Sequence, residues 1–308
     1  MTIGHLYALL CFGIWGFVPL YWKQLTAFSS MELFGHRLWW SFLLMILILG
    51  PRELYQVFRS RRSALGLFLS SALVMSNWYL FVWAVNAGHI VEASLGYFLN
   101  PLFSVLLGVV ILKEKLRKLQ WAAVMIAGIG VAFKFGEAIL SGSLSDGGFW
   151  SVSSLLSLSL SLGISLGLAL TFSSYGLVRK KLGVKPLSGL FGEVTLAVIP
   201  LSAYFFFFHE GAFLFSKVGF GEQLFVVMAG PLTILPLYLF NKSIQTLNLS
   251  TVGIMQYLTP VLQLMCGVWV YQEPFTSATA ITFAFVWGAL ALFTVDRIRY
   301  SHERAALR

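Results

Sequence analysis

The sequence predicts an all-α membrane protein, with ten transmembrane helices arranged as two inverted five-helix repeats. Three observations support this fold class: an apolar composition, ten long apolar runs, and a match between the two halves of the chain. Of the 308 residues, 58% are apolar, 16% are aromatic and only 11% are charged, whereas a soluble domain carries about 25% charged residues. This composition excludes a soluble globular enzyme, a disordered chain and a collagen-like chain.

Ten runs of mostly apolar residues are long enough to cross a bilayer as helices, since a span needs about 20 such residues. The runs are 3–22, 33–50, 64–85, 90–112, 119–135, 152–178, 188–208, 223–241, 250–272 and 277–295. Trp22, Trp121 and Trp150 stand at run ends, where interfacial aromatic side chains are enriched. Both cysteines, Cys11 and Cys266, fall inside runs, so the sequence implies no disulfide framework.

The basic residues collect in alternate loops, which sets the expected orientation. If the N-terminus is cytoplasmic, 17 of the 21 Lys and Arg residues fall in cytoplasmic loops or in the C-terminal tail. Only Lys23, Arg37, Lys134 and Lys217 fall elsewhere. By the positive-inside rule, both termini are therefore expected in the cytoplasm. The same bias explains the net charge of +9 without a nucleic-acid partner.

The two halves of the chain match each other at a fixed offset. Shifting the sequence by 159 residues gives eight identities across the 38 positions 79–116. The identities pair Tyr79-Leu80-Phe81 with Tyr238-Leu239-Phe240, Leu99 with Leu258, Pro101 with Pro260, Gly108-Val109 with Gly267-Val268, and Glu114 with Glu273. Each half carries five runs, an odd number, so the halves must have opposite orientations in the membrane. With a polar linker at 136–149, the predicted repeats are 1–140 and 141–308.

Polar residues in the two matched runs share one face of each predicted helix. The first stripe recurs at i, i+3, i+7 and i+11 and consists of Tyr97, Asn100, Ser104 and Gly108. Its repeat partners are Gln256, Thr259, Gln263 and Gly267. Each stripe stands beside a proline, Pro101 or Pro260, which frees a backbone carbonyl and bends a helix. Polar ties between helices are the alternative, but the matched interruptions favour a binding cavity with the prolines as hinges.

Charged residues inside the runs are candidates for substrate binding and proton coupling. An intramembrane charge is costly, about 2.5–3.5 kcal/mol at a helix centre on insertion scales. Arg37 is expected to hold a substrate carboxylate and His36 to take up protons, and a structural pair with Glu32 is the alternative. Glu193 can carry a coupling proton if its carboxyl is desolvated. The alternative for Glu193 is an ion pair with the basic segment 179–185.

Aromatic and amide side chains in the runs are further candidates for a substrate pocket, because a flat apolar face suits an amphipathic solute. The aromatic candidates are Trp15, Tyr79, Tyr97, Tyr238 and Tyr257, and the amide candidates are Asn77 and Asn241. A lipid-facing or core position is the alternative for the aromatic side chains, and helix bridging for the amides. Glu114 and Glu273 stand at helix C-termini, where the macrodipole disfavours an anion. We therefore expect them to make structural contacts or to form parts of gates.

Five segments carry a family resemblance. They are GIWGFVPLYWK (13–23), MELFGHRLWWS (31–41), EASLGYFLNPL (92–102), GVVILKEKL (108–116) and MQYLTPVLQLMCGVWVYQEPF (255–275). The second contains a Glu-x-x-x-His-Arg element and the last a Gln-Tyr-x-x-Pro element. Together they resemble the RarD branch of the EamA-type drug/metabolite transporter superfamily over nearly the whole chain. The resemblance implies ten helices in two inverted repeats, a bacterial inner-membrane location and export of small metabolites or drugs.

The expected function is secondary transport by alternating access around a central cavity walled by both repeats. The expected substrates are small amphipathic metabolites such as amino acids or related aromatic compounds, with amphenicol-type drugs as a further class. A passive facilitator or channel-like uniporter without proton coupling is the alternative. The sequence has no catalytic dyad, Walker A loop, His-Glu-x-x-His element or dinucleotide fingerprint, so it predicts no enzyme, metal or cofactor. The expected partners are the substrate and the lipid bilayer, without nucleic acid, and the oligomeric state is left open.

Overall fold

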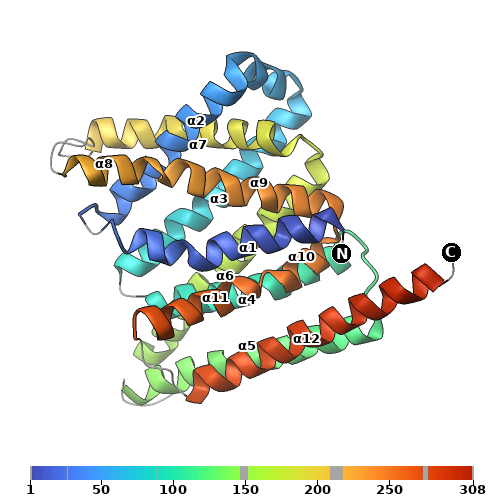
Figure 1. Ribbon diagram of the computed structural model, residues 1–308. Helices are drawn as coiled ribbons and strands as arrows, with labels where there is room; N and C mark the ends of the chain where they lie inside the picture. Colours follow the sequence, from blue (N-terminus) through green and yellow to red (C-terminus); the bar gives the residue numbers. More distant parts are fainter. Residues whose placement is uncertain are drawn as a thin grey trace. The chain divides into compact units, whose positions relative to one another are not determined.

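The computed structural model describes residues 2–25, 27–87, 89–145, 152–208, 218–272 and 277–306. Regular secondary structure in these residues is helical throughout (Figure 1). The first half of the chain forms α1 (Ile3–Trp22), α2 (Ser30–Arg59), α3 (Arg61–Asn86), α4 (Ile90–Val110) and α5 (Lys118–Ser145). The second half forms α6 (Val152–Leu182), α7 (Pro186–Phe208), α8 (Phe220–Val227), α9 (Ala229–Thr246), α10 (Leu249–Met255), α11 (Leu258–Met265), the π-helical turn η1 (Cys266–Val270) and α12 (Ser277–Ala306).

The apolar runs of the sequence lie on these helices. Among the described residues, seven helical stretches are long and apolar enough to cross a membrane. They are Ile3–Trp22, Met31–Arg59, Arg61–Ala84, Leu162–Leu182, Pro186–Phe207, Phe220–Thr246 and Leu249–Val270. Shorter apolar stretches cover Gly96–Val110, Lys118–Phe133 and Ala280–Asp296. Within the described residues, this confirms the prediction of an all-α protein with several membrane-spanning helices.

The chain divides into two compact units, and each unit is discontinuous in sequence. Unit 1 comprises Met1–Val82 and Ser174–Leu247, and unit 2 comprises Trp83–Ser173 and Asn248–Arg308. Helices α3 and α6 are therefore each divided between the units. Both units draw helices from both predicted repeats, 1–140 and 141–308. The units are defined by which residues pack together, whereas the repeats are defined by sequence similarity. The units therefore do not test the repeat boundary, which stays a prediction.

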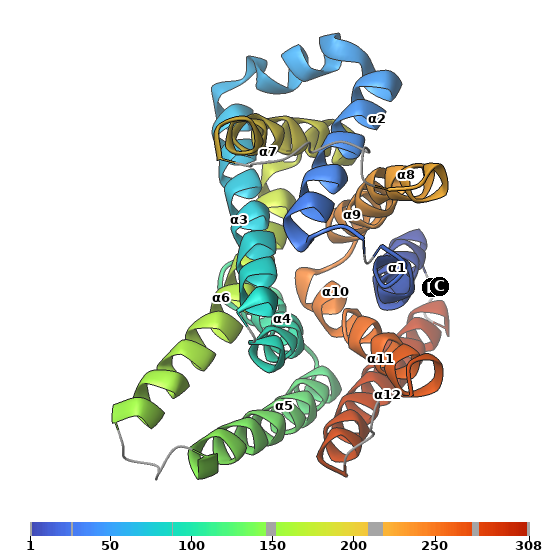
Figure 2. The same cartoon turned by 90° about the vertical axis from the view of Figure 1, so that its left-hand side faces the viewer.

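Unit 1 is built from α1, α2, α7, α8 and α9 with the adjoining parts of α3 and α6. Helix α1 runs beside α9, and α2 packs against both α7 and α9 (Figures 1 and 2). The α2–α9 crossing is close because of Gly230: a Cβ there would lie 2.7 Å from the carbonyl carbon of Trp40. Buried Phe34 and Leu38 of α2 meet Val194 and neighbouring side chains of α7 in an apolar cluster. This packing brings the predicted charged residues of α2 and α7 into one unit.

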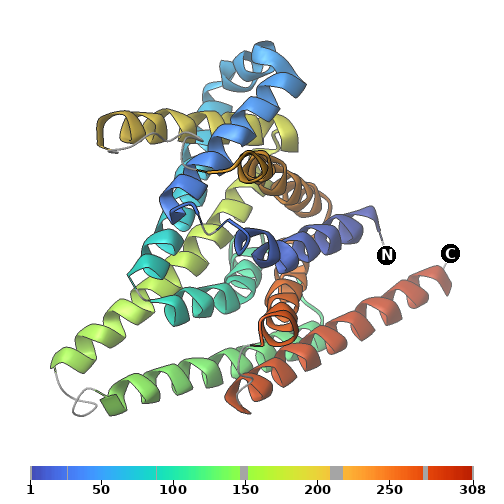
Figure 3. The ribbon, with the colours of Figure 1, turned by 60° about the vertical axis from the view of Figure 1, so that its left-hand side comes forward.

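Unit 2 is built around two helix pairs, α5 with α12 and α4 with α10. Helices α5 and α12 run side by side along much of their length (Figure 3). The α4–α10 contact depends on Gly253, where a Cβ would lie 2.8 Å from the Cβ of Ser104 and 2.9 Å from the carbonyl oxygen of Pro101. Buried Phe98, Tyr257 and Phe283 belong to the apolar cluster of this unit. The two polar stripes of the sequence therefore share one unit.

Several membrane-length stretches are bent or interrupted. Helix α2 turns sharply at Gly50, whose φ of 72° is left-handed and favours glycine, and Pro51 follows directly. The stretch 249–270 is broken at Gln256–Tyr257, between α10 and α11, and ends in η1. Pro260 lies in the first turn of α11, directly after this break, whereas α4 continues as one helix through Pro101. The hinge role of both prolines stays a prediction.

Candidate functional site

Four polar side chains form a closed, buried ring in unit 1. Tyr175 and Arg179 come from α6, Glu193 from α7 and Asn241 from α9, and each is at most 2% exposed. Arg179 Nε donates to Asn241 Oδ1 at 2.8 Å, and Asn241 Nδ2 donates to the Tyr175 hydroxyl at 3.0 Å. The Tyr175 hydroxyl donates to Glu193 Oε2 at 3.3 Å, and Glu193 Oε1 lies 3.3 Å from Arg179 Nε. We call these four side chains the polar ring.

Glu193 has its charge and its lone pairs satisfied inside the protein. The Ser70 hydroxyl of α3 donates to Glu193 Oε1 at 2.5 Å, in addition to the Arg179 and Tyr175 contacts. The Ser71 hydroxyl donates to the backbone carbonyl of Glu193 at 2.9 Å. A buried carboxylate is tolerated when a cation and hydrogen-bond donors surround it. The polar ring therefore ties α6, α7 and α9 together around one ion pair, and the Ser70 hydroxyl adds α3.

Arg179 is completely buried and packs against a glycine. A Cβ on Gly189 would lie 2.6 Å from Arg179 Cζ, so the guanidinium occupies the space of a side chain at that position. Arg179 Nη2 donates to the carbonyl of Pro186 at 3.2 Å, while Nη1 has no hydrogen-bond partner among the described residues. The loop pattern predicts that Arg179 belongs to the cytoplasmic basic segment, but the residue is buried on α6. The ion pair that was the alternative for Glu193 is thus present in the structure.

Arg37 of α2 lies between two indole rings. Its Cζ is 4.5 Å from the centre of the Trp78 ring and 5.2 Å from that of Trp22. Arg37 Nε donates to the Thr233 hydroxyl of α9 at 3.1 Å, and that hydroxyl donates to the Ala229 carbonyl at 2.7 Å. The guanidinium is half-buried. Cation–π contacts of this kind hold a positive charge where water is scarce.

His36 lies one position before Arg37 and is 2% exposed. The Trp40 indole N–H donates to His36 Nδ1 at 3.3 Å, so this nitrogen acts as an acceptor. The ring also makes an edge contact with Phe28, with centroids 5.3 Å apart. Glu32, the alternative partner, caps α2 by accepting from the Ser29 backbone N–H at 2.7 Å. The arrangement ties His36 to its own helix through Trp40.

The other candidates of unit 1 differ in their contacts and in their exposure. Trp15 packs against Phe240, with ring centroids 6.0 Å apart. Tyr238 lies under the Lys242 ammonium at 5.7 Å, and Tyr79 is 58% exposed. Asn77 is 1% exposed, on the same helix as Tyr79. Asn241 is part of the polar ring, and it also donates to the Leu237 carbonyl at 2.8 Å.

The first polar stripe of unit 2 contacts α6. The Ser173 hydroxyl donates to the Asn100 carbonyl at 3.1 Å, and the Ser104 hydroxyl lies 3.2 Å from that of Ser173. The Asn100 amide nitrogen faces the carbonyls of Leu168 and Ala169 at 3.3 Å, a position from which it can donate to both. Asn100 and Ser104 therefore tie α4 to α6 in this structure. Tyr97 of the same stripe is half-buried.

The second polar stripe begins at the break between α10 and α11 and continues along α11. Gln256 and Tyr257 form the break itself, and both side chains are buried. The Tyr257 hydroxyl has no hydrogen-bond partner among the described residues. Gln263 is half-buried in α11. The two stripes thus differ: the first is bonded to α6, whereas the second lies at an interrupted helix.

Glu114 caps a helix from the other half of the chain. Its carboxylate accepts from the backbone N–H groups of Leu249 and Ser250 at 2.7 and 2.9 Å, and from the Ser250 hydroxyl at 2.6 Å. These are the first two residues of α10, where free N–H groups and the helix dipole favour an anion. Glu114 therefore makes the structural contact that was expected of it. Its repeat partner, Glu273, lies outside the described residues.

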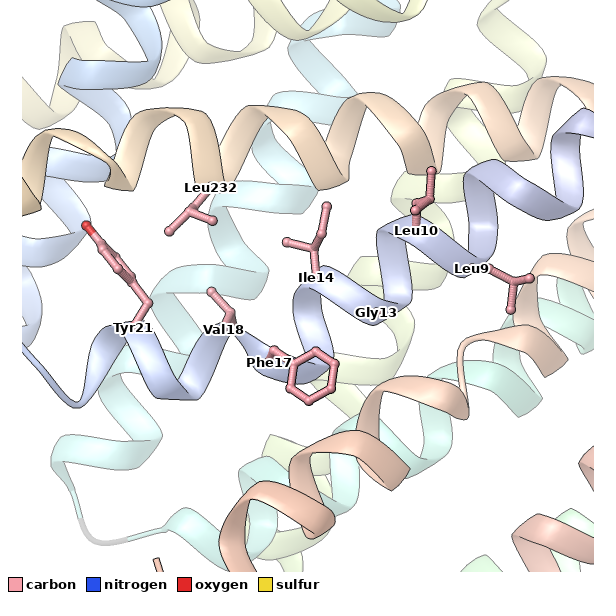
Figure 4. A pocket seen from close by; sticks show the side chains of 8 residues that line it. All are labelled: Leu9, Leu10, Gly13, Ile14, Phe17, Val18, Tyr21 and Leu232. Atoms are coloured by element: carbon pink, nitrogen blue, oxygen red, sulfur yellow. The ribbon is translucent and has the colours of Figure 1, made fainter. Parts of the chain in front are cut away.

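A pocket of about 420 Å³ lies along α1 in unit 1 (Figure 4). Its lining is apolar apart from one hydroxyl and consists of Leu9, Leu10, Gly13, Ile14, Phe17, Val18, Tyr21 and Leu232. The Tyr21 hydroxyl is engaged, because it donates to the Phe225 carbonyl at 2.9 Å. None of the predicted site residues lines this pocket. Its chemistry suits acyl chains or apolar side chains rather than a polar solute.

The structure brings together only some of the predicted site residues. Glu193 meets Asn241 in the polar ring, and Asn100 meets Ser104 through Ser173. Sequence reasoning missed Arg179, Tyr175 and Ser70, and it missed the indole rings of Trp22 and Trp78 around Arg37. The i, i+4 spacing of Tyr175 and Arg179 on one helix face is the signal that would have paired the first two.

Comparison with known proteins places the chain in a class. A sequence model described as the EamA-like transporter family matches residues 2–135 and again residues 159–295. An uncharacterized transporter of Vibrio cholerae is 39% identical over 311 residues, covering 99% of this chain and 96% of its own length. The uncharacterized transporter YojE of Bacillus subtilis is 37% identical over 308 residues, covering 96% and 95%. Protein RarD of Escherichia coli is 35% identical over 312 residues, covering 98% and 97%.

A solved crystal structure shares the fold, with a TM-score of 0.73 at 18% sequence identity, covering 96% of this chain and 98% of the other. The fold and these relatives define a multi-pass membrane transporter rather than an enzyme. The chain belongs to the EamA-like transporter family, and the resemblance of its motifs to the RarD branch is confirmed.

Proposed function

We propose that this transporter moves small amphipathic metabolites across the bacterial inner membrane by alternating access. In this proposal, ten spans form two inverted five-helix repeats, with both termini in the cytoplasm. The support comes from one family model matching two separate segments of similar length, together with five apolar runs in each half of the sequence. Inverted repeats with interrupted helices are typical of secondary transporters.

The observation that carries the substrate proposal is the setting of Arg37. A guanidinium stays charged at all physiological pH values and binds a carboxylate with two parallel hydrogen bonds. Trp22 and Trp78 flank it at cation–π distances and offer flat apolar faces to the rest of a solute. An amino acid or a related aromatic carboxylate combines these two features. Amphenicol-type drugs, which are amphipathic but uncharged, would use the aromatic faces alone.

The remaining predicted lining residues complete the proposed substrate path. They are Trp15, Asn77, Tyr79, Tyr97, Asn100, Ser104, Tyr238, Asn241, Gln256, Tyr257 and Gln263. Pro101 and Pro260 are the proposed bending points. The break at Gln256–Tyr257, just before Pro260, supports this role for the second stripe, because irregular backbone at membrane depth is tolerated where it lines a cavity or is covered by protein.

For proton coupling we propose Glu193 ahead of His36. Protonation of Glu193 would leave Arg179 as a buried cation without its counter-charge, a state that is strongly unfavourable in the closed ring. Proton uptake and opening of the polar ring are therefore linked. The Nδ1 atom of His36 already accepts a hydrogen bond from the Trp40 indole N–H. A passive facilitator without proton coupling remains the alternative function.

The test is uptake of labelled amino acids and of an amphenicol into proteoliposomes, with and without a pH gradient. Saturable uptake that grows with the gradient supports a proton-coupled exporter. In that case Glu193→Gln should abolish the gradient effect while solute exchange at equal pH is kept. Saturable uptake that ignores the gradient supports the facilitator, and uptake that never saturates supports a channel.

Two variants make the test specific. Arg37→Met should raise the KM for an amino acid roughly 10- to 100-fold, the value of one charge-assisted contact, and should leave amphenicol uptake nearly unchanged. Glu114→Gln is the matched control for Glu193→Gln, since it removes a helix-capping carboxylate outside the polar ring. It should keep the gradient effect, and an equal loss in both Gln variants would contradict the coupling role of Glu193.

A further inference from the structure

One face of helix α3 carries an arginine at its N-terminal end, followed by mostly apolar side chains along the rest of the helix. Residues at i, i+4, i+7, i+11, i+14 and i+18 share one face of a helix. On α3 this spacing selects Arg61, Leu65, Phe68, Ala72, Met75 and Tyr79. We call this set the α3 stripe. Arg61 is exposed, and Leu65, Phe68 and Tyr79 are 62%, 64% and 58% exposed.

A groove of about 380 Å³ runs beside the lower part of this stripe, within unit 1. Phe68, Ala72, Met75 and Tyr79 line it from α3 together with Ser71, and apolar side chains of α2 and α7, with the Tyr204 ring, line its other walls. Along the helix axis, Phe68 lies about 10 Å from Arg61 and Ala72 about 17 Å from it. The hydrocarbon depth of one leaflet is roughly 15 Å. An acyl chain whose headgroup lies at Arg61 therefore reaches the end of the groove that Phe68 and Ala72 line.

The charged end of the stripe belongs to an arginine-rich corner. Helix α2 bends at Gly50, and the chain then passes through a short helical stretch into α3 (Figure 2). Arg52, Arg59, Arg61 and Arg62 of this corner are all exposed. Among the described residues, the side chains of Arg61 and Arg62 make no hydrogen bond and no ion pair. Tyr55 of the same corner is 72% exposed, as is usual for an aromatic side chain at a membrane surface.

We propose that the α3 stripe and its groove form a binding site for an anionic phospholipid. The phosphate lies against Arg61 and Arg62, and one acyl chain follows the stripe into the groove. The charge pattern selects this occupant: a cationic end followed by an apolar surface and groove complements a molecule with one anionic head and a long apolar tail. A zwitterionic lipid would gain little from the arginines, and clusters of basic residues at a span end attract anionic headgroups.

The test counts lipids bound to the purified full-length protein by native mass spectrometry. Dioleoyl phosphatidylglycerol is titrated against dioleoyl phosphatidylcholine. Phosphatidylglycerol should bind at one saturable site. The double variant Arg61→Gln/Arg62→Gln should weaken that binding roughly 30-fold, because a basic side chain near an anionic surface contributes about fivefold at room temperature.

Two matched controls distinguish binding at this site from non-specific attraction to basic residues and from non-specific effects of an added bulky side chain. Lys181→Gln/Lys185→Gln removes two exposed basic residues of the same unit that are off the stripe, and it should change binding less than threefold. Ala72→Trp fills the groove and should weaken phosphatidylglycerol binding. Leu69→Trp adds the same bulk to an exposed position on α3 outside the groove lining and should not.

Any of four results would overturn the proposal. Equal binding of the two lipids would show that the headgroup is not recognised. An equal loss in the Lys181 and Lys185 variant would show that only net charge matters, and unchanged binding in Ala72→Trp would show that no chain enters the groove. A dimer mass that Ala72→Trp abolishes, without an effect on lipid, would assign the groove to a second copy of the chain. Since the readout is bound lipid rather than transported solute, the outcome is independent of the proposed function.

Discussion

Arg179 shows how a charged side chain is accommodated among apolar helices. Its exposed fraction is zero, yet Nε contacts both Glu193 and Asn241, and its guanidinium lies in space left open by Gly189. Desolvating an ion pair is expensive, and the loss is offset only when geometry and additional hydrogen bonds are good. The position of Arg179 is thus specified by Gly189 and Glu193 of α7 and by Asn241 of α9.

Removing one member of the ion pair should be worse than removing both. We expect Arg179→Met to lower the free energy of unfolding by about 3–5 kcal/mol, because Glu193 is left as a buried charge without its partner. The double variant Arg179→Met/Glu193→Leu should recover much of that loss. Thermal unfolding in detergent of the two single variants and the double variant measures the coupling.

Arg117 provides the control for this cycle. It pairs with Asp296 in unit 2, and the two side chains are 33% and 7% exposed. Because water reaches one partner of this pair, Arg117→Met should cost about 1–3 kcal/mol, less than Arg179→Met. Equal losses for the two arginine variants would contradict the importance given to burial.

A second prediction concerns Gly189, which packs against the Arg179 guanidinium. A Cβ in Gly189→Ala would overlap the guanidinium, so we expect a loss of about 1–3 kcal/mol from overpacking. Gly128→Ala is the matched control, since a Cβ there meets nothing within 4 Å. That substitution should be neutral or stabilising by up to about 1 kcal/mol, because alanine is the better helix former. Both values come from the same thermal unfolding measurement.

At the scale of elements, helix positions followed from the sequence better than helix interruptions did. The run 3–22 coincides with α1, and the run 33–50 ends at the bend of α2. Pro101 and Pro260 occupy matched positions, but the structure breaks only the second stretch. Pro260 lies in the first turn of α11, where its missing N–H is no loss, whereas Pro101 lies inside α4. A local motif does not reveal which side of a break a proline occupies.

The contribution of the Glu114 cap to helix α10 can be measured at the two backbone amides that it binds. Glu114→Ala should free the amides of Leu249 and Ser250 at a cost of about 0.5–2 kcal/mol, the usual value for a lost N-cap. Hydrogen exchange at these two amides should then become faster by up to roughly 30-fold. Glu222→Ala is the control, because Glu222 caps α8 by accepting from the Gly219 N–H. It should leave the two α10 amides unchanged and accelerate exchange at Gly219 instead.

At the scale of the whole molecule, the class of protein was readable from composition and motifs, but the assembly of the polar ring was not. The apolar runs and the RarD-like segments gave the membrane class and the family. The ring joins α6, α7 and α9, and Ser70 of α3 donates to its Glu193. Ser70 and Asn241 are 171 positions apart. Within one sequence no periodicity connects such residues, because their proximity depends on helix packing.

Alternating access makes a prediction for the whole transporter. Cys11 and Cys266 are buried and form no disulfide among the described residues, so replacing both by alanine gives a background for labelling. Single cysteines at Asn100 and Gln263 should then react with a membrane-impermeant reagent from either side, in proportions that shift when substrate is added. Reaction from one side only, with and without substrate, would count against alternating access. A cysteine at Leu69, exposed on α3, controls for reagent entry through the lipid.

The division of the chain into two discontinuous units has a consequence for its synthesis. Helix α1 ends at Trp22, and its packing partner α9 begins at Ala229. At roughly 5–20 residues per second, the ribosome needs about 10–40 s to supply the partner. During this interval α1 and α2 are in the membrane without α7 and α9, the helices that they pack against in unit 1. The insertion machinery, or a membrane chaperone beside it, must therefore bind these early helices until the last third of the protein has been synthesised.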